Sequence, residues 1–215
     1  TSYDISFASL YGIGRIRNVS PVVMAMRLRE RLNTIGKSEA WTDETTQRVA
    51  EEFSKLSSYH AIYDRPEKEF WKSIDEAIPQ LTPFESHYLN DVMDEAVGNR
   101  LEGYMVEVGP RIIHYYRREK EIVSYPWEDF NDKTKRRSTY MGLLLRGQVY
   151  HNYSLSGQIG LDIAASIDFR SGSKKHNPIN TMKQMHIAGS HLYALADRLL
   201  WNVNAGFDKA FIQIG

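Results

Sequence analysis

The sequence predicts a mainly α fold: a small helical body near the N-terminus, then a helical acidic insertion, then an α+β C-terminal extension. Good helix starts at Ser20 and Thr42, and apolar residues at helical spacing in several segments, favour helices. A third observation is the stretch Tyr11–Arg17, whose two glycines are typical of a tight turn between helices. We therefore expect four segments, at residues 1–58, 59–110, 111–154 and 155–215.

The first segment is expected to hold a helix on each side of the glycine turn. Residues 4–10 are interpreted as a short apolar helix that runs into the turn. Ser20-Pro21 offers a capping hydroxyl followed by a first-turn proline, and Gly36 suits the exit of that second helix. The apolar residues expected near one face of the second helix are Val22, Val23, Met26 and Leu32.

A third helix is predicted to begin after Thr42, which can cap it. Asp43 and Glu44 then lie at its positive end. Val49, Phe53 and Leu56 fall at positions i, i+4 and i+7, which is the spacing of a core stripe. Two helices joined by a glycine turn, with this third helix packed across them, would form the helical body.

The middle segment is aromatic, acidic and interrupted by prolines at 66, 79 and 83. We expect short helices at roughly 66–78, 83–97 and 99–105. A long acidic stretch is repelled by phosphate, so this insertion is expected to face solvent or another protein.

The C-terminal half is predicted from weaker patterns. Residues 110–122 are interpreted as a helix, and residues 158–169 fit either a strand or a buried helix. Residues 179–201 are interpreted as a helix, and the final stretch from 207 to 215 as a short apolar strand that could lie on a neighbouring molecule. The apolar face expected on the 179–201 helix consists of Met182, Met185, Ala188, Leu192, Leu195 and Leu199.

Composition excludes several classes of function. The chain has no cysteine, which rules out disulfides, thiolate metal sites and thiol catalysis. No apolar run approaches the roughly 20 residues that a membrane-spanning helix needs. The net charge is zero overall, but it is +1 over residues 1–58, −7 over 59–110, +4 over 111–154 and +2 over 155–215. Negative charge is thus concentrated in the middle segment.

The glycine stretch has two interpretations. A turn of this kind can point amide N–H groups at a phosphate oxygen, and Arg15 and Arg17 would add charge-assisted donors at the same place. It can equally be a tight corner between helices with two solvated arginines. The stretch alone does not decide between them.

A second stretch, Arg146-Gly147-Gln148 followed by His151 and Asn152, completes an ordered pattern. Tyr11 to Arg15, then Trp41-Thr42-Asp43-Glu44, then Leu143 to Asn152 resemble the small-subunit ribosomal protein thirteen family, most closely its mitochondrial branch. The resemblance covers roughly residues 4–57 and 111–154. Leu144 stands where the family has proline, and Ser138 stands where it has histidine.

The resemblance implies a structural constituent of the mitochondrial small ribosomal subunit, neither an enzyme nor a cofactor-binding or metal-binding protein. It implies binding to small-subunit rRNA in the head, contacts with head protein nineteen, and a bridge to the large subunit beside large-subunit protein five. Further mitoribosomal proteins would meet residues 59–110 and 155–215, with no membrane contact. The implied location is the mitochondrial matrix, with a plastid or the bacterial cytoplasm as alternatives. The rRNA-binding residues implied by the resemblance are Tyr11, Gly12, Ile13, Gly14, Arg15, Arg17, Arg136, Arg137, Arg146, Gly147, Gln148, His151 and Asn152.

Two other classes of function are kept as alternatives. Arg146 and His151 have a spacing that some small metal-independent ribonucleases use, in which histidine moves a proton and arginine holds phosphate. The chain could also be a protein-interaction module that binds no RNA. His186 and His191 are five apart, off the spacing that would place both on one helix face, and are interpreted as surface or interface residues.

Overall fold

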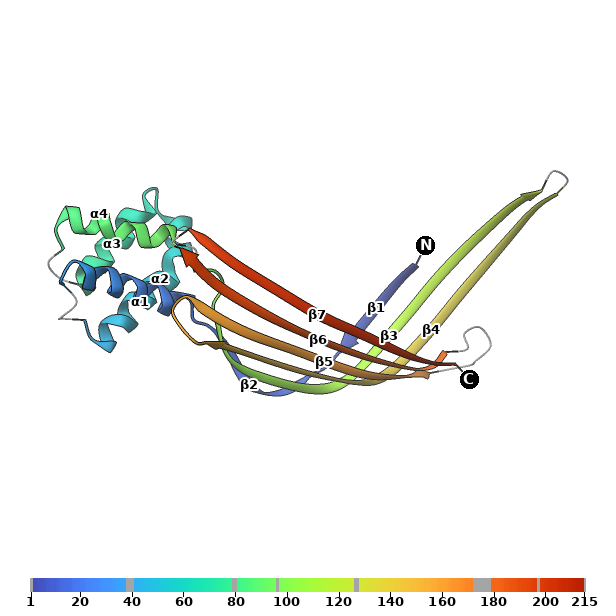
Figure 1. Cartoon of the computed structure of the whole chain (residues 1–215). Helices are drawn as coiled ribbons and strands as arrows, with labels where there is room; N and C mark the ends of the chain where they lie inside the picture. The colour runs from blue at the N-terminus through green and yellow to red at the C-terminus, as the bar shows by residue number, and fades with distance from the viewer. Residues whose placement is uncertain are drawn as a thin grey trace.

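The protein is mainly β, so the prediction of a mainly α fold is wrong. In a computed structural model, strands hold 53% of the residues and helices 34%. The structure describes residues 2–37, 41–78, 81–95, 97–125, 128–171, 179–196 and 198–214, and it leaves undescribed the side chains of residues 2, 117–136, 179–180 and 214. Figure 1 shows the arrangement: one long, bent antiparallel sheet with a cluster of helices at one end.

The sheet has seven strands, and every neighbouring pair is antiparallel. The strands follow the order β1-β3-β4-β5-β6-β7, with β2 also on β3. Strands β3 and β4 are the longest and extend as a hairpin beyond the rest of the sheet (Figure 1). The strand bounds are β1 Ser2–Ala8, β2 Tyr11–Asn18, β3 Leu101–Tyr125, β4 Glu128–Asn152, β5 Gly157–Ser171, β6 Ile179–Ala196 and β7 Leu199–Ile214.

Strands β1 and β2 follow each other along the same edge of β3. Ser2 is opposite Arg117 and Ala8 is opposite Arg111, and the same register resumes with Tyr11 opposite Val108. Between the two strands, the backbone N–H of Ser9 donates to the carbonyl of Pro110 at 3.1 Å. The two strands therefore act as one continuous edge with a short interruption.

The helices form one unit between β2 and β3, which we call the helical unit. It consists of α1 Ser20–Thr34, α2 Asp43–Ile62, α3 Pro66–Ala77, α4 Pro83–Asn90 and the 3₁₀ helix η1 Asp91–Asp94. Its own hydrophobic core includes Leu28, Val49, Phe70 and Leu89, all inaccessible to solvent. Helices from the predicted segments 1–58 and 59–110 thus share one core.

Local sequence signals, such as capping residues and helix-ending glycines, predicted most of the helical unit correctly. The Thr42 hydroxyl accepts a hydrogen bond from the N–H of Thr45 at 3.1 Å, as expected of a cap. Gly36 has φ +73° just after α1, as expected at a helix exit. The helix expected at 66–78 is confirmed by α3, and that at 83–97 is shorter than expected because α4 passes into η1 after Asn90.

Two details of α1 are corrected, and one detail of α2 is confirmed. The Ser20 hydroxyl does not cap α1; it accepts from the N–H of Arg100 at 2.9 Å and donates to the carbonyl of Gly98 at 3.3 Å. Met26 and Val22 are exposed, whereas Val23 and Leu32 are buried as expected, together with Ala25 and Leu28. The stripe on α2 is confirmed, with Val49 and Phe53 buried and Leu56 packed against them.

Four predicted helices are strands. Residues 4–10 and 110–122 lie largely in β1 and β3, residues 99–105 enter β3, and residues 179–201 form β6 and the start of β7. The physical reason is a period of two: side chains on these segments alternate between two faces of the sheet. In β6 the residues Met182, Met185, Leu192 and Leu195 match helical spacing only because apolar residues occupy both faces. The ambiguous stretch 158–169 is β5, and the expected strand at 207–215 belongs to β7.

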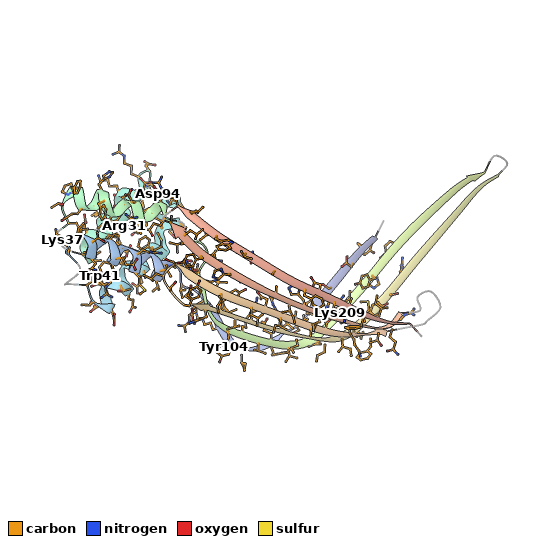
Figure 2. The ribbon with its side chains drawn as sticks, viewed as in Figure 1. Arg31, Lys37, Trp41, Asp94, Tyr104 and Lys209 are labelled. Atoms are coloured by element: carbon orange, nitrogen blue, oxygen red, sulfur yellow. The ribbon has the colours of Figure 1, made fainter. Side chains whose placement is uncertain are left out.

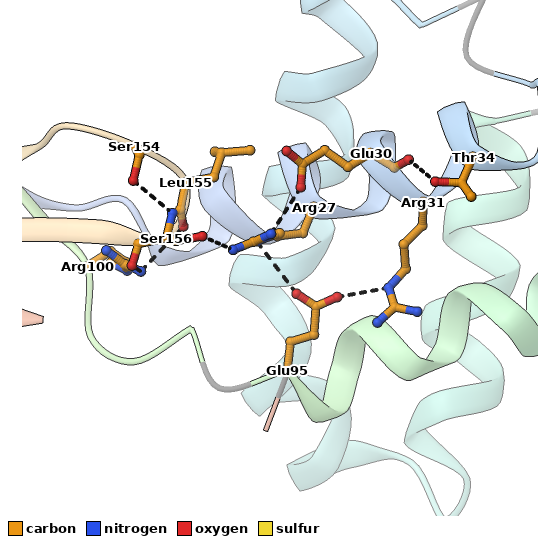
Figure 3. A network of polar contacts seen from close by, with 9 residues as sticks. All are labelled: Arg27, Glu30, Arg31, Thr34, Glu95, Arg100, Ser154, Leu155 and Ser156. Carbon is orange, nitrogen blue, oxygen red and sulfur yellow. Dashed lines mark hydrogen bonds and ion pairs between the residues drawn. The ribbon is translucent and has the colours of Figure 1, made fainter. Parts of the chain in front are cut away.

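A network of arginines joins the helical unit to the sheet (Figure 3). Arg100, fully buried, donates to the carbonyls of Val97 (2.9 Å), Leu155 (3.3 Å) and Ser156 (2.7 Å). Arg27 of α1 donates to the Ser156 hydroxyl at 2.6 Å, and its Nε lies 3.6 Å from Glu95. Glu95 also accepts from Arg31 Nε at 2.8 Å. These contacts hold the turn between β4 and β5 against α1 and against the segment before β3.

Candidate functional site: a sheet with one apolar and one polar face

The two faces of the sheet differ in chemistry because the strand registers place apolar residues opposite apolar residues on one side of the sheet. Val108 of β3 is opposite Leu145 of β4, which is opposite Ala165 of β5, which is opposite Met185 of β6. We call this side the apolar face. Its exposed large side chains on β3, β4 and β5 are Tyr104, Val106, Val108, Ile112, Met141, Leu143, Leu145, Val149, Ile159, Leu161, Ile163 and Phe169. The flanking strands continue it with Tyr3, Ile5, Phe7, Tyr11, Ile13, Met185, Trp201, Val203, Phe207 and Phe211.

The apolar face is open and the opposite, polar face is crowded. A Cβ added to Gly147 or Gly189, which belong to the apolar face, would have no neighbour within 4 Å. A Cβ added to Gly142 or Gly160, on the polar face, would collide with atoms of the adjacent strands. Side chains splay apart on the outside of a bend and converge on its inside, so the apolar face is convex. Figure 2 shows Tyr104 on the outside of the bend.

Hydrogen-bonded polar groups occupy much of the concave face, beside a small apolar cluster of Ile113, Tyr140 and Met182. Asp162 of β5 accepts from the Tyr150 hydroxyl at 2.7 Å and from the Gln148 amide. Burial, together with the hydrogen bond to Asp162, raises the pKa of Tyr150 to about 12. The phenol therefore stays protonated and donates throughout the physiological range.

A groove of about 370 Å³ lies further along this face. Arg111 is one of its lining residues and donates to Ser166 at 3.2 Å and to Gln184 at 3.4 Å. At its other side, His186 Nδ1 is 2.7 Å from an Asp208 carboxylate oxygen. The hydrogen-bond donors and acceptors of this groove are largely paired with one another. This pairing is typical of polar groups that stabilise a fold.

The residues predicted from the two glycine-containing stretches are brought together, but as strands. Gly12 of β2 is opposite Glu107 of β3, which is opposite Arg146 of β4. Ile13, Val106 and Gly147 form the next row, and Gly14, Met105 and Gln148 the row after that. The stretch Tyr11–Arg17 is therefore no turn between helices, and that expectation is wrong. Tyr11, Arg15, Arg17 and Arg146 have exposed side chains.

The remaining predicted residues lie near the two ends of β4. Arg137 is exposed, with its guanidinium 5.5 Å from the ring centroid of Tyr116, and the side chain of Arg136 lies outside the described residues. The Asn152 backbone N–H and side chain donate to Glu102 at 2.7 and 2.8 Å, and His151 lies 3.1 Å from the same carboxylate. Arg146 and His151 are five residues apart on one strand, so they project from opposite faces. The ribonuclease alternative gains no support from that placement.

Gly14 is the one glycine of the two stretches whose conformation requires glycine. Its φ is +100°, and an added Cβ would collide with the carbonyl oxygen of Tyr104. Replacing Gly14 with alanine is expected to lower the free energy of unfolding by about 1–3 kcal/mol, through backbone strain and displacement of β3. Urea denaturation followed by circular dichroism measures the change.

Gly147→Ala is the matched control, because its Cβ would enter open space on the apolar face. This substitution is expected to be neutral or to stabilise by about 0.5–1 kcal/mol, since alanine restricts the unfolded chain. Equal destabilisation by both substitutions would contradict the positive-φ requirement at Gly14.

The described residues offer little for metal binding or helical membrane insertion. Among them, no group of three or more His, Asp or Glu residues could hold a metal ion. Every helix in the described part of the chain is too short or too polar to cross a lipid bilayer.

The apolar face is the feature that sequence reasoning missed, although a signal for it was present. Alternate residues from Tyr104 to Val108, from Met141 to Leu145 and from Ile159 to Ile163 are all apolar. This period of two is the mark of strands with one apolar side. Comparisons with protein-family models, curated proteins and solved structures found no match to this chain.

Proposed function

We propose that this protein is a structural subunit of an assembly of several copies, in which the apolar face of one copy packs against that of a second. The single observation that carries the proposal is the apolar face itself, which no element of the described chain covers. Soluble monomers rarely expose contiguous apolar patches beyond a few hundred Å², and larger ones mark interaction sites.

The extent of the patch supports a stable contact. The eleven large side chains from Tyr104 to Ile163 on β3, β4 and β5 are between 38% and 57% exposed. A large side chain exposed to this degree leaves roughly 80 Å² accessible, so together they leave on the order of 900 Å², against roughly 800 Å² per partner in a standard interface.

The chemistry of the patch supports a second copy as the partner. Between Tyr104 and Ile112, and along the facing residues of β4 and β5, the apolar face carries no charged side chain. Among the described residues, charges appear around it, at Arg15, Arg17, Glu102, Arg137, Lys183 and Lys209. Two copies can therefore meet across a two-fold axis without bringing like charges together, and an apolar centre with a polar rim is the usual anatomy of an interface.

The ribosomal assignment stays a prediction, and the sheet gives it less support than it gives self-association. RNA binding depends on clustered cations that neutralise phosphates. On the described part of the polar face, the cations are Arg111, Arg146 and Arg170, and the carboxylates are Asp4, Glu107, Asp162, Asp168 and Asp208. The protein-interaction module raised from sequence agrees better with the two-faced sheet.

The test is the double substitution Leu145→Glu with Ile163→Glu, both at the centre of the apolar face. Sedimentation equilibrium of the wild-type chain is expected to give more than one copy per particle at micromolar concentration. The double variant is expected to dissociate at least about 100-fold more readily, because burying unpaired carboxylates is strongly unfavourable.

Ile62→Glu is the matched control, because Ile62 is 72% exposed at the end of α2 and lies outside the sheet. It should leave the association unchanged. A wild-type chain that is monomeric at every concentration tested would contradict the proposal, and so would a double variant that associates as the wild type does.

A further inference from the structure

The two edges of the sheet match each other in length. On one side, β1 and β2 form a single edge from Ser2 to Asn18, because both follow one register along β3. On the other side, β7 runs from Leu199 to Ile214. The described side chains of both edges are almost all exposed. An edge strand also leaves alternate backbone N–H and C=O groups without a partner in its own sheet.

The two edges run in opposite directions. The path from β1 to β7 crosses six strands, and each is antiparallel to the next. Placing β7 of one copy beside the β1–β2 edge of another therefore continues the antiparallel order without interruption. Within one copy the two edges are separated by the width of the sheet, roughly 24 Å at the usual strand spacing, so they cannot pair with each other.

The usual protection of sheet edges is weak here. Natural edges are commonly shortened, or carry prolines and several charges. Neither β1, β2 nor β7 contains proline, and the only charged residues of the 16-residue β7 are Asp208 and Lys209. Asp4, Arg15 and Arg17 are the charged residues of the opposite edge.

One register pairs the two edges along nearly their whole length and keeps the apolar residues of both copies on the same side of the sheet. If Ser2 is placed opposite Ile214, then Ile13 lies opposite Val203, Ile5 opposite Phe211 and Arg15 opposite Trp201. The last three of these pairs belong to the apolar face in their own copies. A shift by one residue would place apolar residues opposite polar ones along the whole edge. The end-to-end alignment therefore also keeps the two faces continuous across the junction.

We propose that copies of this chain join head to tail, with β7 of one copy hydrogen-bonded antiparallel to the β1–β2 edge of the next. This deepens the proposed function, because it supplies the second contact by which self-association extends beyond a pair. An interface between two different edges generates a closed ring or a filament, whereas the contact between apolar faces only generates pairs.

The absence of cysteine from the chain makes the register directly testable by disulfide trapping. Directly opposed residues of antiparallel strands have Cα atoms about 4.5–5.5 Å apart, within the range that a disulfide spans. Purified Ile13→Cys and Val203→Cys proteins are mixed and oxidised. A disulfide-linked dimer is expected in the mixture and only at trace level in either protein alone. A single chain carrying both substitutions is expected to give a ladder of linked multimers.

Ile13→Cys mixed with Asn204→Cys is the matched control, because residue 204 lies on the polar face. It should link at least tenfold less than the 13–203 pair. Equal linking of the two mixtures, or no 13–203 link in a chain that sedimentation shows to be oligomeric, overturns head-to-tail pairing and leaves the proposed function standing. A wild-type chain that is monomeric throughout overturns both.

Discussion

Replacing Arg100 with methionine is expected to lower the free energy of unfolding by about 3–5 kcal/mol, because several buried carbonyls lose a charged donor at once. Arg100 is fully buried and is the meeting point of three parts of the chain. Its guanidinium donates to Val97 in the segment before β3, and to Leu155 and Ser156 in the turn between β4 and β5. Its backbone carbonyl accepts from the N–H of Val19 at 2.8 Å, just before α1.

Methionine nearly fills the same space but cannot donate a hydrogen bond. The carbonyls of Leu155 and Ser156 would then be left without the guanidinium in the junction. Desolvation by burial, with a smaller contribution from nearby Arg27, lowers the pKa of Arg100 below its usual value. The lowered pKa means that burial disfavours the charged form of Arg100. The hydrogen bonds to carbonyls stabilise the charge in that position.

Arg100→Lys is the informative control for this substitution. Lysine keeps the charge but lacks the planar fork that reaches two carbonyls at once, so we expect it to recover only part of the loss. Urea denaturation followed by circular dichroism gives the free energies. If the methionine variant were as stable as the wild type, Arg100 would be a passive buried residue and another contact would hold the helical unit on the sheet.

The helical unit could be predicted from the sequence because its signals are local. Thr42 caps α2 through a neighbour three residues away, and Pro66 and Pro83 stand in the first turns of α3 and α4. None of these depends on what the chain does elsewhere. The same holds for Gly36, whose positive φ ends α1.

The sheet could not be predicted in the same way, because its register is set by residues far apart in the chain. Val108 and Leu145 become neighbours only when β3 and β4 pair, and Ser20 reaches Arg100 across 80 positions. In β6, apolar residues on both faces imitate a helical stripe, so spacing alone favoured the wrong element. The strand pairing places the candidate residues Gly12 and Arg146 one strand apart, on either side of Glu107, which their spacing in the sequence did not indicate. The apolar face beside them was missed.

Replacing Phe70 with alanine is expected to have a comparably large effect, and one confined to the helical unit. Phe70 is fully buried, and its ring centroid lies 5.0 Å from that of Phe53 and 5.5 Å from that of Trp71. Loss of such a ring from a packed core costs about 3–5 kcal/mol, from lost burial and from the cavity left behind. Phe84→Ala, at a residue 77% exposed on α4, should change stability by less than about 0.5 kcal/mol.

Tryptophan fluorescence can separate the two parts of the molecule in this experiment. Trp41 and Trp71 report on the helical unit, whereas Trp201 lies on the edge strand β7. With single-tryptophan versions, the Phe70→Ala transition should move to lower urea at Trp71 and much less at Trp201. Because the core around Phe70 contains no residue of the sheet, self-association through the apolar face should survive the substitution. Loss of association together with the helical unit would instead mean that the helices shape the sheet surface on which assembly depends.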